Sequence, residues 1–234
     1  METVEVQEIT IIVIKAIIAI AMGVFAGNSL VFVFNHVPAT WLCEYNEQPA
    51  EELKEKGKQR IKSVPWKYAL SAFFSAAGLY VITLGGHNIE YILPVIISMW
   101  LLMMIAFADA KYMIIPDQFV IFLILISAGF IPFGSTLKDM LLGAAIGAGI
   151  MFVTGLMGRF IVKKEALGFG DVKLMVAIGM LSGFYGCIGI MAAASIAAGI
   201  WFMVGMARGN VKKGDMKPLG PFLAGAAMLY LLVF

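Results

Sequence analysis

Long runs of apolar residues, separated by short polar clusters, constrain the fold of this 234-residue chain more than any other feature. A helix needs about 20 apolar residues to cross the hydrocarbon core of a bilayer. Hydrophobic residues make up 61% of the chain and charged residues 14%, whereas soluble globular chains are about one-quarter charged. An outer-membrane barrel would require segments of alternating polarity, which this sequence lacks. We therefore predict an all-α, polytopic integral membrane protein.

The apolar runs predict about eight transmembrane helices. The run from Val172 to Met206 is too long for one ordinary span, and the small residues Ser182, Gly183 and Gly186 suit a turn inside it, so we divide it there. The predicted spans are 9–34, 68–86, 91–108, 119–133, 140–158, 172–184, 187–206 and 218–234. A seven-span arrangement without the last helix remains an alternative. We expect two parts: residues 1–67, which hold the first helix and a short loop, and a helical core over 68–234.

Basic residues gather on one predicted side of the membrane. With Lys173 counted at the boundary, the loops on that side hold every lysine and arginine except Lys15 and Lys138. These loops are 35–67, 109–118, 159–171 and 207–217. Loops rich in lysine and arginine usually stay in the cytoplasm. We therefore predict a multi-pass protein of the cytoplasmic (inner) membrane, with both termini outside.

Three carboxylates stand at predicted membrane boundaries. Ionisable groups at membrane depth are costly, which makes them functional candidates. Loops or termini account for the other acidic residues, and Asp109, Asp117 and Asp171 remain. Asp109 closes the third predicted span and Asp171 opens the sixth, so both are expected at the cytoplasmic ends of their helices. Two facing carboxylates can share one proton, and such a pair can activate a water and protonate a scissile carbonyl.

A structural role is the alternative for each of these acids, because aspartate is a good helix N-cap. On spacing alone, this alternative stays open for Asp171. We interpret Asp117, which follows Pro116, as a cap of the fourth span and expect Asp117→Asn to keep most of any activity. Gly168 and Gly170 precede Asp171 and carry no side chains, so an extended peptide could lie close to the backbone there.

Four segments of the chain resemble type 4 prepilin peptidases. Glu165-Ala-Leu-Gly-Phe-Gly-Asp-Val-Lys-Leu is similar to the family signature E-(A/G)-(M/L)-G-x-G-D-x-K-L around its second aspartate. Six residues separate Asp109 from Pro116-Asp117, and this segment is similar to the first-aspartate segment D-x6-P-(D/N). The stretches 27–38 and 218–224 are similar to G-S-F-L-N-V-V-I-x-R-L-P and P-F-G-P-F-L-A. The resemblance implies that Asp109 and Asp171 are catalytic, and that the substrate-binding or site-shaping residues are Gly168, Gly170, Glu165 and Lys173.

The function implied by this resemblance is that of a prepilin leader peptidase, an aspartyl endopeptidase with a GxGD motif. Such an enzyme removes the basic leader from prepilin or pseudopilin precursors at the cytoplasmic membrane boundary, in type IV pilus assembly and protein secretion. The expected partners are a precursor protein and the lipid bilayer, with no nucleic acid. The aspartyl chemistry requires no metal and no organic cofactor.

The loop after the first predicted helix departs from the family pattern. Many bacterial members carry four zinc-binding cysteines there, whereas this loop has only Cys43. The family's Asn and Arg positions in the first segment are Val31 and His36 here. In two-activity members this region is linked to N-methylation. We therefore expect cleavage without methylation, with S-adenosylmethionine as a cofactor only if that second activity is retained.

Two other functions are weighed against this one. Presenilin-type intramembrane proteases also have a Gly-x-Gly-Asp motif, but their first aspartate follows a tyrosine in mid-helix, whereas Asp109 follows Ala108. A transporter belongs to a different class and often shows two matching halves with broken helices. We find no such internal repeat in this sequence. A cleavage assay separates the classes, because a transporter would leave a prepilin intact.

Overall fold

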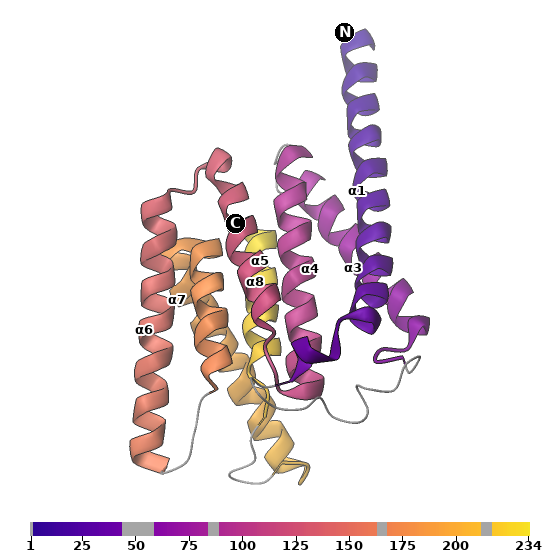
Figure 1. Ribbon diagram of the computed structural model, residues 1–234. Helices are drawn as coiled ribbons and strands as arrows, with labels where there is room; N and C mark the ends of the chain where they lie inside the picture. Colours follow the sequence, from indigo (N-terminus) through magenta and orange to yellow (C-terminus); the bar gives the residue numbers. More distant parts are fainter. Residues whose placement is uncertain (1, 44–58, 84–88, 163–167, 212–216) are drawn as a thin grey trace.

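A computed structural model describes residues 2–43, 59–83, 89–162, 168–211 and 217–234. These residues form helices and connections, with no strand among them, which confirms the predicted all-α class (Figure 1). The elements are α1 (Glu2–His36), the 3-10 helix η1 (Ala39–Leu42), α3 (Ser63–Thr83), α4 (Ile89–Tyr112), α5 (Asp117–Ser127), the 3-10 helix η2 (Ala128–Phe133), α6 (Leu137–Val162), α7 (Phe169–Ala207) and α8 (Gly220–Val233).

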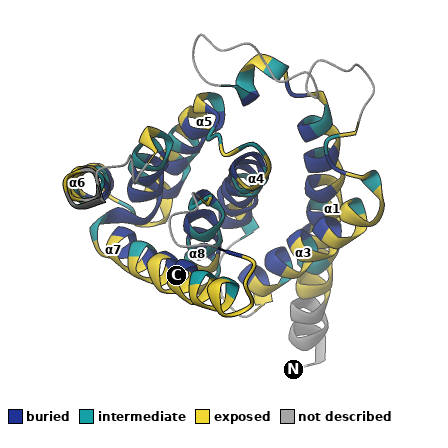
Figure 2. Cartoon of the chain, turned by 90° about the horizontal axis from the view of Figure 1, so that it is seen from below, coloured by how far each residue is buried: buried dark blue, intermediate teal, exposed yellow. Residues whose placement is uncertain are grey.

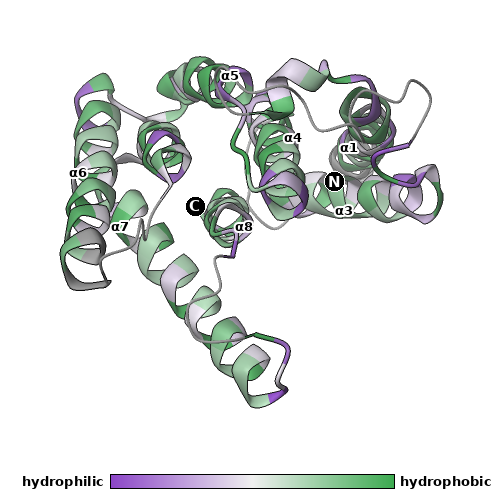
Figure 3. Ribbon diagram, turned by 60° about the horizontal axis from the view of Figure 1, so that its bottom comes forward, coloured by the Kyte–Doolittle hydropathy of each residue, from purple (hydrophilic) through white to green (hydrophobic). Residues whose placement is uncertain are grey.

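The length and polarity of the helices fit a polytopic membrane protein. Among the described residues, four stretches are long and apolar enough to cross a membrane: Thr10–His36, Ile89–Tyr112, Leu137–Met157 and Phe169–Ala207. Asp117–Phe133 and Gly220–Val233 are shorter apolar helices. Figure 3 shows hydrophobic residues along the helix surfaces and hydrophilic ones gathered near helix ends. Large apolar side chains such as Phe25 and Phe160 are exposed, as expected on a surface that faces lipid.

The helix α7 contains the break that the small residues of its sequence predict. Gly183 has φ 69° and ψ −172°, and the two halves of α7 on either side of it run in opposite directions (Figure 1). Two neighbouring helices satisfy backbone groups that the break leaves free. The Phe184 N–H donates to Asp139 Oδ1 of α6 at 3.2 Å, and the Tyr230 hydroxyl of α8 donates to the Ser182 carbonyl at 3.1 Å. The predicted division of this long apolar run is therefore confirmed.

Replacing Gly183 by alanine is expected to destabilise the protein by about 2–4 kcal/mol. This combination of φ and ψ is essentially restricted to glycine, and a Cβ at Gly183 would overlap Asp139 Oδ2. Thermal unfolding of the purified protein in detergent measures the effect. Gly189→Ala is the matched control, since a Cβ at Gly189 of the same helix meets open space. Equal melting temperatures for the two variants would contradict this account of the break.

The helices alternate in direction, so that every second connection lies at the same end of the bundle. The ends of α1, α4 and α6 and the starts of α3, α5, α7 and α8 lie at the lower end in Figure 1, and both termini of the chain lie toward the other end. This is the grouping of loops predicted from the spans. It brings the end of α4, with Asp109, and the start of α7, with Asp171, to the same end.

Helix α4 lies at the centre of the bundle. It packs against α8, α5, α1 and α3, and Figure 2 shows these helices around it. Its fully buried side chains include those of Val95, Met99, Leu102, Met104 and Ile105. Small residues bring the outer pairs close together, as at Gly23 and Gly27 of α1 against Ser75 and Ser71 of α3. Asp109 therefore projects from the most enclosed helix of the fold.

Candidate active site

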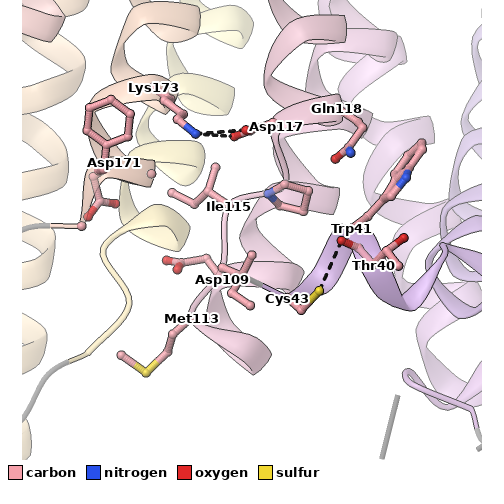
Figure 4. A pocket seen from close by; sticks show the side chains of 15 residues that line it. Thr40, Trp41, Cys43, Asp109, Met113, Ile115, Asp117, Gln118, Asp171 and Lys173 are labelled. Carbon is pink, nitrogen blue, oxygen red and sulfur yellow. Dashed lines mark hydrogen bonds and ion pairs between the residues drawn. The ribbon is translucent and has the colours of Figure 1, made fainter. Parts of the chain in front are cut away.

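A cavity of about 670 Å³ opens at the end of the bundle where the two predicted aspartates meet (Figure 4). Its walls come from η1, the end of α4, the connection 113–116, the start of α5 and the first turn of α7. The lining residues are Thr40, Trp41, Cys43, Asp109, Met113, Ile114, Ile115, Pro116, Asp117, Gln118, Gly168, Phe169, Gly170, Asp171 and Lys173. Asp109, Asp171, Gly168, Gly170 and Lys173, all predicted from sequence, thus line one cavity.

Asp109 lies in the last turn of α4, where it is only 5% exposed. Its Oδ2 accepts a hydrogen bond of 2.7 Å from the backbone N–H of Gly220, the first residue of α8. The first N–H groups of a helix have no partner within the helix and favour an anion. No side chain at Leu219, the N-cap of α8, forms a capping hydrogen bond. The Asp109 carboxylate therefore accepts a hydrogen bond from the first N–H group of α8, and this bond holds the carboxylate in place.

Gly220 is a site residue that the sequence analysis missed. It lies in the stretch 218–224, which resembles a family segment, but the sequence alone does not show which residue that segment contacts. The available signal was local: a glycine followed by Pro221 at the start of an apolar run is typical of a helix N-terminus. The structure adds that this helix start points its N–H at Asp109.

Asp171 is the third residue of α7 and is not its N-cap. Gly168 occupies the cap position, and the Asp171 N–H donates to the Gly168 carbonyl at 3.1 Å. The side chain is partly buried and lines the same cavity as Asp109. Figure 4 shows both carboxylates on the cavity wall, one from each helix end. Asp171 is therefore not the N-cap of α7.

The two glycines before Asp171 differ in their surroundings. Gly170 faces the connection between α4 and α5, and a Cβ at this position would lie 3.2 Å from Ile115 Cβ. Gly170 thus lets the first turn of α7 approach that connection closely. Gly168 is exposed at the mouth of the cavity. The expectation that an extended peptide lies along this backbone stays a prediction, and Glu165 lies outside the described residues.

Asp117 forms an ion pair with Lys173, which corrects its interpretation as a helix cap. Pro116 is the N-cap of α5, and no side chain there makes a capping hydrogen bond. Asp117 lies one residue further on, inside the first turn of α5. The Lys173 ammonium of α7 donates to both of its oxygens, at 2.8 Å to Oδ1 and 3.0 Å to Oδ2. The local cap rule failed because a cation from a distant part of the chain binds this carboxylate.

Among the described residues, cysteine and histidine side chains do not gather at the cavity. Cys43 lines it, and its thiol donates to the Thr40 carbonyl at 3.4 Å. Cys43 and Cys187 are both free thiols, and within the described ranges no three His, Cys, Asp or Glu side chains are grouped to hold a metal ion. The absence of a metal requirement stays a prediction. The chemistry that these walls offer is that of two carboxylates, Asp109 and Asp171, beside the ion pair of Asp117 and Lys173.

Sequence comparison supports the family resemblance found in the sequence. A model of the "Type IV leader peptidase family" matches residues 96–203, a range that includes both aspartates. Leader peptidase HopD of Escherichia coli is 35% identical over 126 residues, which cover 52% of this chain and 80% of that protein. A prepilin leader peptidase/N-methyltransferase of Aeromonas salmonicida is 26% identical over 146 residues (60% of this chain and 49% of the relative). That of Pseudomonas aeruginosa is 27% identical over 135 residues (57% and 47%). No solved structure matches the chain.

Fold and cavity together define a polytopic membrane protein with two aspartates at one end of its helical bundle. The chain belongs to the type IV leader peptidase family. It spans about half the length of the prepilin leader peptidase/N-methyltransferases that it matches.

Proposed function

We propose that this protein is a prepilin leader peptidase that cleaves its substrate with Asp109 and Asp171 as an aspartyl pair. The observation that carries the proposal is the meeting of two carboxylates, from the end of α4 and the start of α7, in one cavity at the end of the bundle. A pair of this kind shares one proton. Its members can therefore take the roles of general base and general acid in the same step.

The proposed reaction is hydrolysis of one peptide bond. The ionised aspartate takes a proton from a water, whose oxygen adds to the scissile carbonyl, while the protonated aspartate donates its proton to the carbonyl oxygen. Collapse of the tetrahedral intermediate breaks the C–N bond. The leaving amine takes the proton that the first aspartate removed from water, and the second aspartate recovers its proton from a hydroxyl of the intermediate, so the pair returns to its starting state. The products are a leader with a new carboxylate and a mature protein with a new amino group. The Gly220 N–H holds Asp109 in a fixed orientation during these steps.

The proposed substrates are small membrane-anchored precursors of the prepilin or pseudopilin type, which serve type IV pili and protein secretion. Their leader is basic and their next segment is apolar, so the scissile bond lies where cytoplasm meets membrane. A cavity at the ends of apolar helices suits that position. The concentration of basic residues in the connecting loops supports an inner-membrane protein whose active site faces the cytoplasm. The acidic loop residues that could attract a basic leader lie within 44–58, outside the described residues.

The rival functions predict other outcomes in the same assay. The purified protein in detergent is incubated with a prepilin, and the product masses are measured. Cleavage at the junction between leader and apolar segment supports the proposal. Cleavage within the apolar segment would indicate a presenilin-type protease, although Asp109 lies in the last turn of α4 and not in mid-helix. An intact prepilin would favour a transporter.

Chelators are expected to leave cleavage unchanged, and an inhibition reversed by zinc would contradict a metal-free site.

We further predict that the mature product is not methylated. Residues 44–58 hold most of the short loop and lie outside the described residues, but the structure describes some of its apolar anchors. Leu42 is buried, and Trp41 packs edge-on against Phe119 of α5 at a centroid distance of 5.9 Å. Trp66 packs similarly on Phe107, at 5.3 Å. These anchors contact the helical bundle and so are not free to build a separate cofactor pocket.

The mass of the mature pilin after incubation with enzyme and S-adenosylmethionine tests this prediction. We expect complete cleavage and an unmodified amino terminus. A bifunctional relative, such as the prepilin leader peptidase/N-methyltransferase of Pseudomonas aeruginosa, serves as the positive control. A gain of one methyl group with the present protein would show that the short loop suffices for the second activity.

A further inference from the structure

The ion pair between Lys173 and Asp117 joins the two chain segments that carry the aspartates. Lys173 follows Asp171 by two residues and is the fifth residue of α7, and Asp117 begins α5 directly after the connection from α4. Both oxygens of Asp117 lie within 3.0 Å of the Lys173 nitrogen. The two residues are 56 positions apart in the chain, so the pair is a tertiary link between the two segments.

Lys173 does not share the direction of Asp171. Residues two positions apart on a helix do not face each other, and Figure 4 shows Lys173 directed at α5 while the Asp171 carboxylate points into another part of the cavity. The Lys173 ammonium also lies over the Phe169 ring, 5.2 Å from its centroid. Its contacts in the structure are thus with the walls of the cavity. This arrangement suits a residue that acts on Asp171 through the helix that both occupy.

A second contact between the same two segments lies beside the ion pair. Ile115, in the connection from α4 to α5, packs against Gly170, which immediately precedes Asp171. The first turn of α7 is therefore held at two points, one apolar and one charged. Two points fix its rotation about the helix axis as well as its distance from α4. Rotation of this turn is the movement that would swing the Asp171 carboxylate away from Asp109.

We propose that the ion pair between Lys173 and Asp117 positions Asp171, so that its carboxylate stays aligned with that of Asp109. The proposal rests on the proposed function. It also replaces the expectation that Asp117→Asn keeps most activity, which assumed that Asp117 is only a helix cap. The side chains of Lys173 and Asp117 are 38% and 55% exposed, and ion pairs as open as this contribute little to global stability. Loss of the pair is therefore expected to affect the alignment of the carboxylates more than the folding of the protein.

Steady-state cleavage of a prepilin by single and double variants tests the proposal. Lys173→Met and Asp117→Asn are each expected to lower kcat roughly ten- to a hundredfold with little change in KM, because misalignment by about 1 Å has effects of that size. The double variant is expected to be no slower than the slower single variant, since the two residues act as one unit. Lys173→Arg retains a cation that can bind a carboxylate, and it is expected to restore cleavage.

Matched controls remove one charge of each kind elsewhere. Lys67 on α3 and Glu90 at the start of α4 are not among the cavity-lining residues, so Lys67→Met and Glu90→Gln are expected to cleave at the rate of the unmodified protein. An unchanged kcat for Lys173→Met would overturn the proposal. Additive losses in the double variant would also overturn it, as would a loss confined to KM, which would mean direct contact with substrate.

A cross-linking experiment tests the same alignment without relying on cleavage. Asp109→Cys and Asp171→Cys are combined in a chain that also carries Cys43→Ala and Cys187→Ala, so that the free thiols of the described residues do not interfere. A short bis-maleimide should join the two introduced cysteines, and adding Lys173→Met should slow that reaction severalfold. An equal rate with and without Lys173 would refute the positioning role even if no prepilin were cleaved. Failure of the unmodified protein to cleave would instead refute the proposed function alone.

Discussion

Asp109→Asn and Asp171→Asn are each expected to lower kcat for prepilin cleavage by at least about a thousandfold. One carboxylate cannot be base and acid in the same step, so the loss of either group stops the reaction rather than slowing it. Asparagine keeps the size of aspartate, and its amide oxygen can still accept the hydrogen bond that Gly220 donates to Asp109. The rate is measured with purified variants in detergent, by the mass or mobility of the product.

The amount of each variant in the membrane and its melting temperature show whether the substitution acts on chemistry or on folding. Both variants are expected to insert and to unfold near the temperature of the unmodified protein. Glu90→Gln, at the far end of α4 from Asp109, removes a carboxylate from the same helix and should remain fully active. An active Asp109→Asn together with an inactive Asp117→Asn would show that the catalytic residue on this side of the cavity has been assigned wrongly.

Much of this fold could be predicted from sequence because the bilayer permits few solutions. Backbone polar groups in hydrocarbon must be satisfied within a helix or a closed barrel, so the apolar runs predict helices directly. The length limit on a span also divided the long run near Ser182, Gly183 and Gly186, and the structure breaks the helix at Gly183, where φ is 69°. Alternation of helix direction then required the end of α4 and the start of α7 to share one end of the bundle, as they do in Figure 1.

The contacts that shape the site could not be predicted in this way. Asp109 and Gly220 are 111 residues apart, and Asp117 and Lys173 are 56 apart. A local rule is the only guide that sequence offers for such residues, and it indicated a helix cap for Asp117. The rule failed because it considers only the N–H groups of the same helix. Here the Asp117 carboxylate binds a charged lysine ammonium from another helix instead. Which helix ends touch depends on packing between small residues such as Gly143 and Gly179, and hydropathy does not show it.

Gly220→Ala is expected to lower kcat about a hundredfold while the protein still folds. A Cβ at Gly220 would lie 2.6 Å from Asp109 Oδ2 and 3.0 Å from its Cγ, distances at which the carboxylate must move. Alanine retains the backbone N–H and suits a helix, so the change acts mainly by displacing the acceptor of that hydrogen bond. Because Asp109 lies in the last turn of the buried helix α4, its side chain rather than the helix is expected to shift.

Gly225→Ala is the matched control for this prediction, because a Cβ at Gly225 of the same helix α8 meets open space. It should cleave a prepilin at the rate of the unmodified protein, and it corrects for any general effect of alanine on α8. Combining Gly220→Ala with Asp109→Asn should cost no more activity than Asp109→Asn alone, since both changes act on the same carboxylate. Equal kcat values for Gly220→Ala and Gly225→Ala would show that the Gly220 N–H does not hold Asp109 during catalysis. A selective loss at Gly220 would instead show that the start of α8 helps to build the active site, together with the end of α4 and the start of α7.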